Sequence, residues 1–175
     1  MASKAARFRV NTTLSTVDVG LRVNLHPSHV NANALSGLIE CELDDKGWPR
    51  LDRPYSARLA LRVDAITSAQ GLQDREMRRR FDARRYPVIR ARVVDGKALR
   101  GAGRYRAVAE LTMHGETREI SADIRLKVEG ATMLVDGRQV INIKDFGIDP
   151  PRLLILKVEP EVDVDVHIVA DLLPS

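Results

Sequence analysis

Apolar and polar residues alternate along most of this chain. In residues 17–25, valine or leucine occupies every second position, and polar residues fill most of the positions between them. The same pattern recurs in residues 35–43, 59–65, 105–113, 120–128 and 162–168. A period of two places successive side chains on opposite faces of a β-strand, so each segment has one dry face and one wet face. The pattern therefore predicts an all-β protein made of antiparallel strands.

Short polar or glycine-containing breaks lie between neighbouring runs and are typical of turns. They are Asp44–Gly47, Asp95-Gly96, His114-Gly115, Glu129-Gly130 and Asp136-Gly137. Connections this short favour a meander, in which successive strands pair with each other. The pattern gives about eight strands, the number at which a closed barrel can still enclose one small ligand. A two-sheet sandwich would show similar alternation, so the sequence favours a barrel without excluding the sandwich.

One stretch has helical rather than strand periodicity, and we expect one short helix near residues 72–83. Met77 and Phe81 are four residues apart and share one helix face, with Gln73 one turn earlier. The Tyr86-Pro87 dipeptide should end the helical tendency, because the residue before a proline is pushed toward extended geometry. A short helix within an all-β pattern predicts a lid across one end of the barrel.

The polar side of this helix is rich in charge. Asp74–Arg78 and Glu76–Arg80 are spaced as favourable i,i+4 ion pairs, which we expect on the outer surface. Eight arginines lie within residues 75–92, and the formal net charge of the chain is +4. They could form a patch for an anionic headgroup, for nucleic acid or for a transient contact with a membrane surface. The interpretation that the sequence favours is a solvated face with internal ion pairs.

Length and composition predict a single domain over residues 1–175, with residues 1–6 as a loose tail. No apolar run approaches the roughly 18 residues needed to span a bilayer, and no secretory signal pattern is present. Cys41 is the single cysteine, which fits a reducing compartment. We therefore expect a cytoplasmic location. Edge strands often pair, so a homodimer is compatible with this pattern.

The predicted inward positions include small residues, namely Gly37, Ala65, Ala107, Ala109 and Ala122. Aromatic residues make up 4% of the chain, so an aliphatic lining is expected. Such a lining suits a flexible hydrocarbon chain, whose burial is worth about 0.8 kcal/mol per methylene. The alternative is that these side chains pack against each other as a solid core. The residues expected to contact a chain are Val19, Leu21, Val23, Leu59, Leu61, Val63, Met77, Phe81, Tyr105, Ala107, Ala109, Leu111, Ile124, Leu126, Ile143, Val164 and Val166.

No group of residues predicts catalysis. His26 and His29 flank Pro27 and lack partners at metal-ligand spacing, so a polar loop is the simpler interpretation. Neither His114 nor His167 has a serine or cysteine nucleophile nearby in the sequence. The arginines are not accompanied by a zinc-finger spacing, a helix-turn-helix or an aromatic ladder. We therefore expect a non-enzyme without cofactor, without metal and without a nucleic-acid partner.

Three motifs occur in a characteristic order. They are Asp74–Arg78 with Phe81-Asp82 and Arg85–Ile89, then Ala109–Thr117, then Ile143–Ile148. With them the chain resembles the YceI-like family of bacterial lipid- or polyisoprenoid-binding proteins over nearly its whole length. The resemblance implies a lipocalin-like antiparallel barrel that holds an extended isoprenoid or fatty chain in its lumen.

Two functions follow. The first is the binding or carriage of a hydrophobic chain, such as a polyisoprenoid, an isoprenoid quinone or a fatty-acyl lipid. The alternative is a stress-associated interaction scaffold with a solid core, whose basic helix binds an acidic partner. An apolar interior cavity of several hundred Å³ would favour the first.

Overall fold

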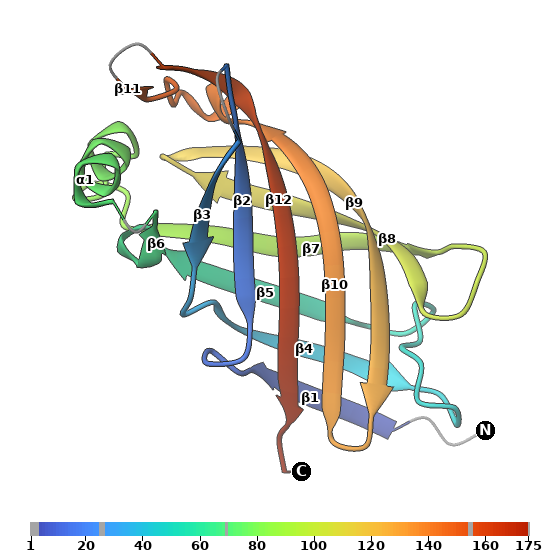
Figure 1. The fold of residues 1–175 in the computed structure, drawn as a ribbon. Coiled ribbons are helices and arrows are strands. Elements are labelled where there is room, and N and C mark those ends of the chain that lie inside the picture. Colours follow the sequence, from blue (N-terminus) through green and yellow to red (C-terminus); the bar gives the residue numbers. More distant parts are fainter. Residues whose placement is uncertain (1–3, 25–26, 69, 154–155, 175) are drawn as a thin grey trace.

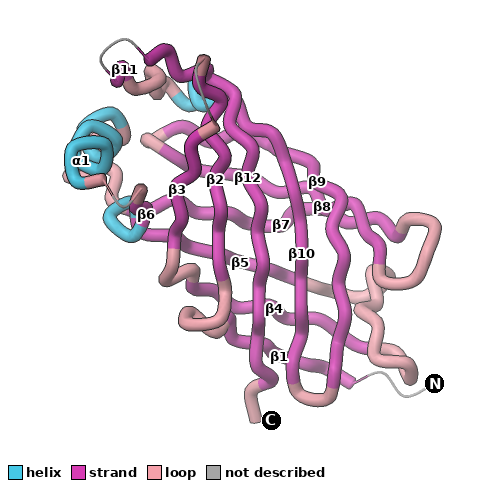
Figure 2. The backbone as a smooth tube through the Cα atoms, in the orientation of Figure 1, coloured by secondary structure: helices cyan, strands magenta, loops and turns pink. Residues whose placement is uncertain are grey.

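The structure is a computed structural model, and it describes residues 4–24, 27–68, 70–153 and 156–174. Most of these residues lie in β-strands (Figure 2). The strands are β1 (Lys4–Val10), β2 (Thr16–Val23), β3 (Ser28–Ala32), β4 (Ser36–Leu43), β5 (Ser56–Arg62), β6 (Ile66–Thr67), β7 (Val88–Ala98), β8 (Arg104–Met113), β9 (Glu116–Glu129), β10 (Thr132–Asn142), β11 (Arg152–Leu153) and β12 (Leu156–Leu172). The helical elements are η1 (Val63–Ala65), α1 (Gly71–Arg80) and η2 (Ile143–Phe146).

Eight of the described strands close into a barrel in the order β1-β4-β5-β7-β8-β9-β10-β12, and β12 pairs back with β1 (Figure 1). Every pairing among the described strands is antiparallel. The barrel prediction is confirmed, and the sandwich is excluded. Closure leaves no long unpaired sheet edge between β1 and β12.

Strand β12 closes the barrel with two different partners along its length. Its carboxyl-terminal end pairs with β1, for example Val10 with Ala170, and its preceding part pairs with β2, for example Thr16 with His167. Strand β2 continues the sheet through β3 to β6, which follows β5 in the chain. The wall beside α1 is therefore completed by β2, β3 and β6, whereas β1 and β4 complete the other end (Figure 1).

The ladder between β9 and β10 is incomplete. The two strands pair from Glu129–Thr132 to Ile124–Gly137, and no further pairs form although both strands continue toward α1. Figure 1 shows the two strands separating beyond this level. We call this separation the β9–β10 seam. Its wide end is covered by η2, which lies against β9 and β12, and by the buried side chains of Phe146 and Ile148.

Two predicted turns are wrong. Asp95-Gly96 lies inside β7, where a register shift between Val93 and Asp95 marks a bulge. Asp136-Gly137 lies inside β10, and a Cβ atom at Gly137 would come within 3.1 Å of Ile124 Cγ2. Bulges and bends in long barrel strands use the same small and polar residues as turns, so the local sequence does not separate the two.

The limits of three other elements also differ from expectation. The strand predicted over residues 59–65 ends at Arg62, because Val63–Ala65 forms η1. The predicted loose tail is wrong from Lys4 onward, since β1 starts there and Ala6 is buried; residues 1–3 lie outside the described part. His29 lies in β3 rather than in a polar loop, while Leu25 and His26 lie outside the described residues.

Helix α1 forms where expected, although it ends at Arg80. The predicted Glu76–Arg80 ion pair is present at 2.8 Å, and Arg79 joins it at 2.9 Å. The predicted Asp74–Arg78 pair is wrong, because Asp74 is buried and accepts hydrogen bonds from Ser68 N (2.8 Å) and Ser68 Oγ (2.6 Å). Asp74 thus ties the helix to the segment that follows β6. Within the described residues, no helix is long and apolar enough to cross a bilayer.

Candidate ligand cavity

The barrel encloses a cavity of about 420 Å³. This volume lies within the roughly 300–1,000 Å³ of small-molecule sites. Strands β2, β3, β4, β5, β7, β8, β9, β10 and β12 contribute lining residues, and most of these are aliphatic. Strand β1 contributes none. Instead Phe8 is fully buried and packs with Cys41 and Ala170 at that end of the barrel. The interior is therefore solid near β1 and hollow toward α1.

Fifteen of the seventeen predicted contact residues line this cavity: Val19, Leu21, Leu59, Leu61, Met77, Phe81, Tyr105, Ala107, Ala109, Leu111, Ile124, Leu126, Ile143, Val164 and Val166. Their contact with a ligand stays a prediction. Val23 is not in the lining and pairs with Val158 near the end of β2. Val63 is buried in η1 and is also outside the lining, because the strand has ended one residue earlier.

Of the five small residues predicted to face inward, only some line the cavity. Ala107, Ala109 and Ala122 line the cavity, whereas Gly37 and Ala65 do not. Gly37 serves close strand packing instead, since a Cβ atom there would lie 2.3 Å from the carbonyl oxygen of Arg58 on β5.

Sequence reasoning missed the inward residues of β7 and β10. In β7 these are Ile89, Ala91, Val93 and Gly96, and in β10 they are Met133, Val135, Gly137, Gln139 and Ile141. The signal was present in β7, where Ile89, Ala91 and Val93 alternate with polar residues; it is weak in β10, where Met133, Leu134 and Val135 are consecutive and apolar. The misplaced turns at 95–96 and 136–137 divided each run before its length could be recognised.

Helix α1 lies beside one end of the barrel (Figure 1). Its residues Gln73, Met77 and Phe81 line the cavity, so the predicted inner face of the helix is confirmed. The flank of the helix beside this face carries the partly buried Glu76 carboxylate. Hydrogen bonds first from Arg79 and then from Arg80 lower the pKa of Glu76 to about 2. These bonds lie within the helix and link its last turn to its middle.

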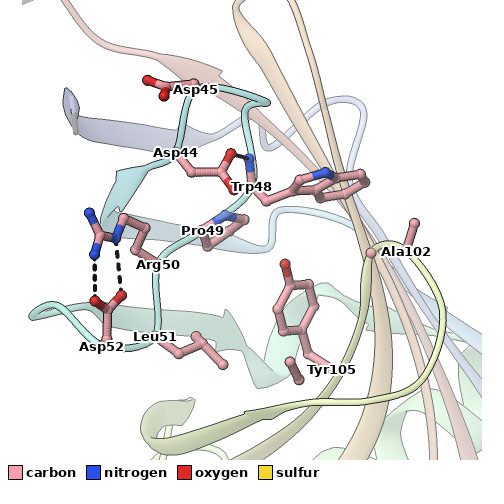
Figure 3. Close-up of a pocket in the computed structure, with 11 residues that line it drawn as sticks. Asp44, Asp45, Trp48, Pro49, Arg50, Leu51, Asp52, Ala102 and Tyr105 are labelled. Carbon is pink, nitrogen blue, oxygen red and sulfur yellow. Dashed lines mark hydrogen bonds and ion pairs between the residues drawn. The ribbon is translucent and has the colours of Figure 1, made fainter. Parts of the chain in front are cut away.

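The loop between β4 and β5 lies at another end of the cavity. Pro49, Leu51 and Tyr105 line both the cavity and an outer hollow of about 570 Å³. Figure 3 shows this hollow with Trp48 and the Arg50–Asp52 ion pair at its edge. Burial, and secondarily Asp44, raises the pKa of Tyr105. Its phenol therefore stays protonated at neutral pH and can donate a hydrogen bond.

The three sequence motifs meet at one point beside the cavity. The rings of Tyr86 and His114 pack edge to face with centroids 5.1 Å apart, and His114 Nδ1 lies 3.0 Å from the carbonyl oxygen of Phe146. Gly115 has a φ of +77°, and a Cβ atom there would lie 2.7 Å from Tyr86 Cε1. Tyr86, His114 and Phe146 are not part of the lining. The motifs therefore join β7, the β8–β9 turn and η2, and they fix the wide end of the β9–β10 seam.

The other polar candidates lie outside the cavity. His167 is on the outer surface, with Nδ1 2.6 Å from Asp136 Oδ1. Cys41 is buried, and burial raises the pKa of its thiol to about 11, so the reactive thiolate is scarce at neutral pH. Among the described residues, no three His, Cys, Asp or Glu side chains gather in a way that could hold a metal ion.

The basic stretch is partly neutralised. Arg79 and Arg80 pair with Glu76, and Arg92 pairs with Glu110. Arg75 and Arg84 are exposed and form no ion pair within the described part of the chain. Both interpretations of this stretch, a solvated face and an anion-binding patch, therefore keep some support.

Several solved structures share this fold. Burkholderia cenocepacia BcnA is 19% identical with a TM-score of 0.76, and the match covers 91% of this chain and 98% of that protein. A Saccharophagus degradans domain, described as a polyisoprenoid binding domain implicated in plant cell wall breakdown, is 14% identical with a TM-score of 0.71; the match covers 94% of this chain and 97% of that domain. The Campylobacter jejuni YceI protein is 12% identical with a TM-score of 0.64, with 81% of this chain and 83% of that protein covered.

Among curated proteins, no sequence matches this chain. The profile of the YceI-like domain matches residues 7–170, which include every strand of the closed barrel, the lid helix and all three motifs. The resemblance seen in the sequence is confirmed, and the chain belongs to the YceI-like domain family.

Proposed function

We propose that this protein binds the hydrocarbon chain of a lipid, such as a polyisoprenoid, an isoprenoid quinone or a fatty-acyl molecule, and carries or stores it unchanged. One observation carries the proposal: the barrel holds a cavity of about 420 Å³ with a predominantly aliphatic wall. Each methylene transferred from water into such a cavity contributes about 0.8 kcal/mol. A chain of several carbons could therefore bind without any charged contact.

The distribution of aromatic residues supports a flexible chain over a ring-shaped ligand. The aromatic residues of the lining are Tyr55, Phe81 and Tyr105, whereas the strands between them contribute Ala, Val, Leu and Ile. Stacking of a sugar or a nucleobase needs flat aromatic surfaces, and among the lining residues of the strands only Tyr105 on β8 offers one. The polyisoprenoid-binding description of the Saccharophagus degradans domain supports the same ligand class.

The alternative scaffold function loses its main support, because it was predicted together with a solid core. The interior is packed near Phe8 and Cys41, but it also holds the aliphatic cavity of about 420 Å³. We therefore retain the carrier function, without catalysis, as the proposal.

The direct test is to extract the purified protein with organic solvent and to identify the extract by mass spectrometry. We expect a hydrophobic chain at close to one molecule per protein. As a second arm, the extracted protein should take up farnesol, measured by the displacement of Nile red. Absence of lipid in repeated preparations together with no uptake of farnesol would contradict the proposal.

The proposal extends to where the ligand is exchanged. Leu72 is 76% exposed in the first turn of α1, and Arg75 and Arg79 on the same helix are exposed. An apolar side chain among cations suits a transient contact with an anionic membrane surface. Liposome sedimentation tests this contact. We expect the protein to bind anionic vesicles in preference to neutral ones. We likewise propose a cytoplasmic location and a homodimer, to be tested by cell fractionation and by light scattering.

A further inference from the structure

Gln139 is a polar side chain on the inner face of the barrel. In β10 the inward positions alternate with outward ones, and Gln139 shares the inner face with Val135 and Ile141. It lines the cavity and is partly buried. No hydrogen bond involves its side-chain amide among the described residues. An amide carries two donors and an acceptor, so it is poorly matched to an apolar wall unless a partner is supplied.

The other amide in the lining is already satisfied. Gln73 donates a hydrogen bond from Nε2 to Gln70 Oε1 at 2.6 Å, and both residues belong to the start of the lid helix. A nearby hydroxyl is used in the same way, because Ser68 Oγ donates to Asp74 Oδ1 at 2.6 Å. The polar groups beside the helix thus serve the helix itself.

The basic residues that border the cavity are also engaged. Arg106 holds Asp123 through two hydrogen bonds of 2.7 and 3.1 Å, and Arg138 holds Asp165 through two of 2.6 and 3.1 Å. All four side chains are on the outer face of the barrel, half exposed. No described lining residue therefore presents a free positive charge to the interior, which disfavours a phosphate or carboxylate head there.

The wall around Gln139 leaves room for a ligand group. The β9–β10 ladder stops at the Ile124–Gly137 pair, so Ala122, the next inward residue of β9, has no pair on β10. Ala122 pairs with Ala107 on β8, and Ala107 pairs with Gly96 on β7. At the level of Gln139 the three neighbouring strands therefore present two alanines and a glycine to the cavity.

We propose that Gln139 binds the neutral, oxygen-bearing head of the chain ligand, a hydroxyl or a carbonyl, at the β9–β10 seam. This inference rests on the proposed function and adds the chemical class of the head. A hydroxyl or carbonyl can pair with the amide of Gln139, while the hydrocarbon chain occupies the aliphatic part of the cavity. The alanines of β8 and β9 give the head the space that larger side chains would fill. The space in front of Gly96 on β7 is taken by Tyr55, whose hydroxyl would lie 3.3 Å from a Cβ atom there.

The test compares Gln139→Leu with the wild-type protein after solvent extraction. The probes are farnesol, the saturated hydrocarbon farnesane, which lacks the hydroxyl, and farnesyl phosphate, and the readout is Nile red displacement. Loss of one neutral hydrogen bond should weaken farnesol binding about fivefold and leave farnesane binding unchanged. Gln139→Met serves as a second variant of similar volume. Asn33→Leu also replaces an amide with leucine, at an exposed position outside the cavity, and should alter neither affinity.

The outcomes separate this inference from the proposed function. If the wild-type protein binds neither farnesol nor farnesane, the carrier function fails. If it binds both, but Gln139→Leu and Gln139→Met bind farnesol as tightly as the wild type, only the role of Gln139 fails. An equal loss for farnesol and farnesane would indicate a packing effect and would also overturn that role. Tighter wild-type binding of farnesyl phosphate than of farnesol would overturn the neutral head.

Discussion

The hydroxyl of Ser15 supplies a hydrogen-bond acceptor to the backbone N–H of Val169, whose carbonyl oxygen also accepts from Asn11 N at 2.7 Å. Ser15 Oγ accepts a hydrogen bond from Val169 N at 3.0 Å and donates one to Val169 O at 3.1 Å. Val169 lies between the part of β12 that pairs with β1 and the part that pairs with β2. The fully buried Ser15 side chain therefore closes the wall at the point where the barrel changes partners.

Replacing Ser15 with Ala should destabilise the protein by about 1–3 kcal/mol, because a buried backbone N–H would lose its acceptor. Urea-induced unfolding measures the free energy change. Ser36→Ala is the matched control, since Ser36 is exposed and forms a longer hydrogen bond of 3.3 Å to Ala60 O. Its effect should stay within about 0.5 kcal/mol. Equal effects of the two substitutions would contradict this role of Ser15.

The β8–β9 turn is expected to depend on the absence of a side chain at Gly115. Gly115→Ala should cost about 1–3 kcal/mol, because the backbone has a left-handed φ and the methyl group would collide with the Tyr86 ring. Gly130→Ala is the control: its φ is +58°, but no atom lies within 4 Å of the added carbon. Thermal unfolding should show a larger loss for Gly115→Ala. If the two losses are equal, the contact with Tyr86 contributes nothing.

Filling the cavity should abolish lipid retention without unfolding the barrel. Ala109 lines the cavity between Val93 on β7 and Ile120 on β9, so Ala109→Trp places an indole in the space assigned to the chain. Val108→Trp places the same indole on the outer face of β8 and should retain the lipid. Extraction with mass spectrometry measures lipid content, and circular dichroism checks the fold. Full loading of a folded Ala109→Trp protein would show that the chain lies elsewhere.

Glu76 predicts an acid-dependent loss of stability in the lid helix. Its pKa is about 2 in the folded protein against an ordinary value of 4.5, because Arg79 and then Arg80 hydrogen-bond to the carboxylate. A lowered folded-state pKa contributes stability above the ordinary value, and this contribution is lost as the pH falls from about 4.5 toward about 2. The stability difference between wild type and Glu76→Gln should therefore shrink across this range and vanish at its lower end.

Urea unfolding between pH 2 and pH 7 provides the measurement for Glu76. Glu119→Gln is a suitable control, because Glu119 is exposed and has no ion pair in the described ranges. The control should not reproduce the pH dependence. A Glu76 effect that stays constant from pH 7 to pH 2 would show that the two arginines do not stabilise the carboxylate.

The inner and outer faces of most strands could be predicted from the sequence, because a period of two needs no knowledge of neighbouring strands. The same holds for the inner face of α1, where Met77 and Phe81 line the cavity as their spacing predicts. The sequence alone could not show whether Asp95-Gly96 and Asp136-Gly137 form turns or lie within strands. Whether a small residue makes a turn or a bend depends on the strands beside it.

Alternation of side chains by itself determined that this protein is an antiparallel β-structure with an aliphatic interior, since that pattern records which positions avoid water. Only the tertiary structure decided that the interior is packed around Phe8 and contains a cavity on the side of α1. It alone decided that the Gln139 side chain faces this cavity without a hydrogen-bond partner among the described residues. It also decided that β9 and β10 separate beyond Gly137. The physical reason is that the size of a cavity and the satisfaction of a polar group depend on side chains from many strands, which are far apart in the sequence.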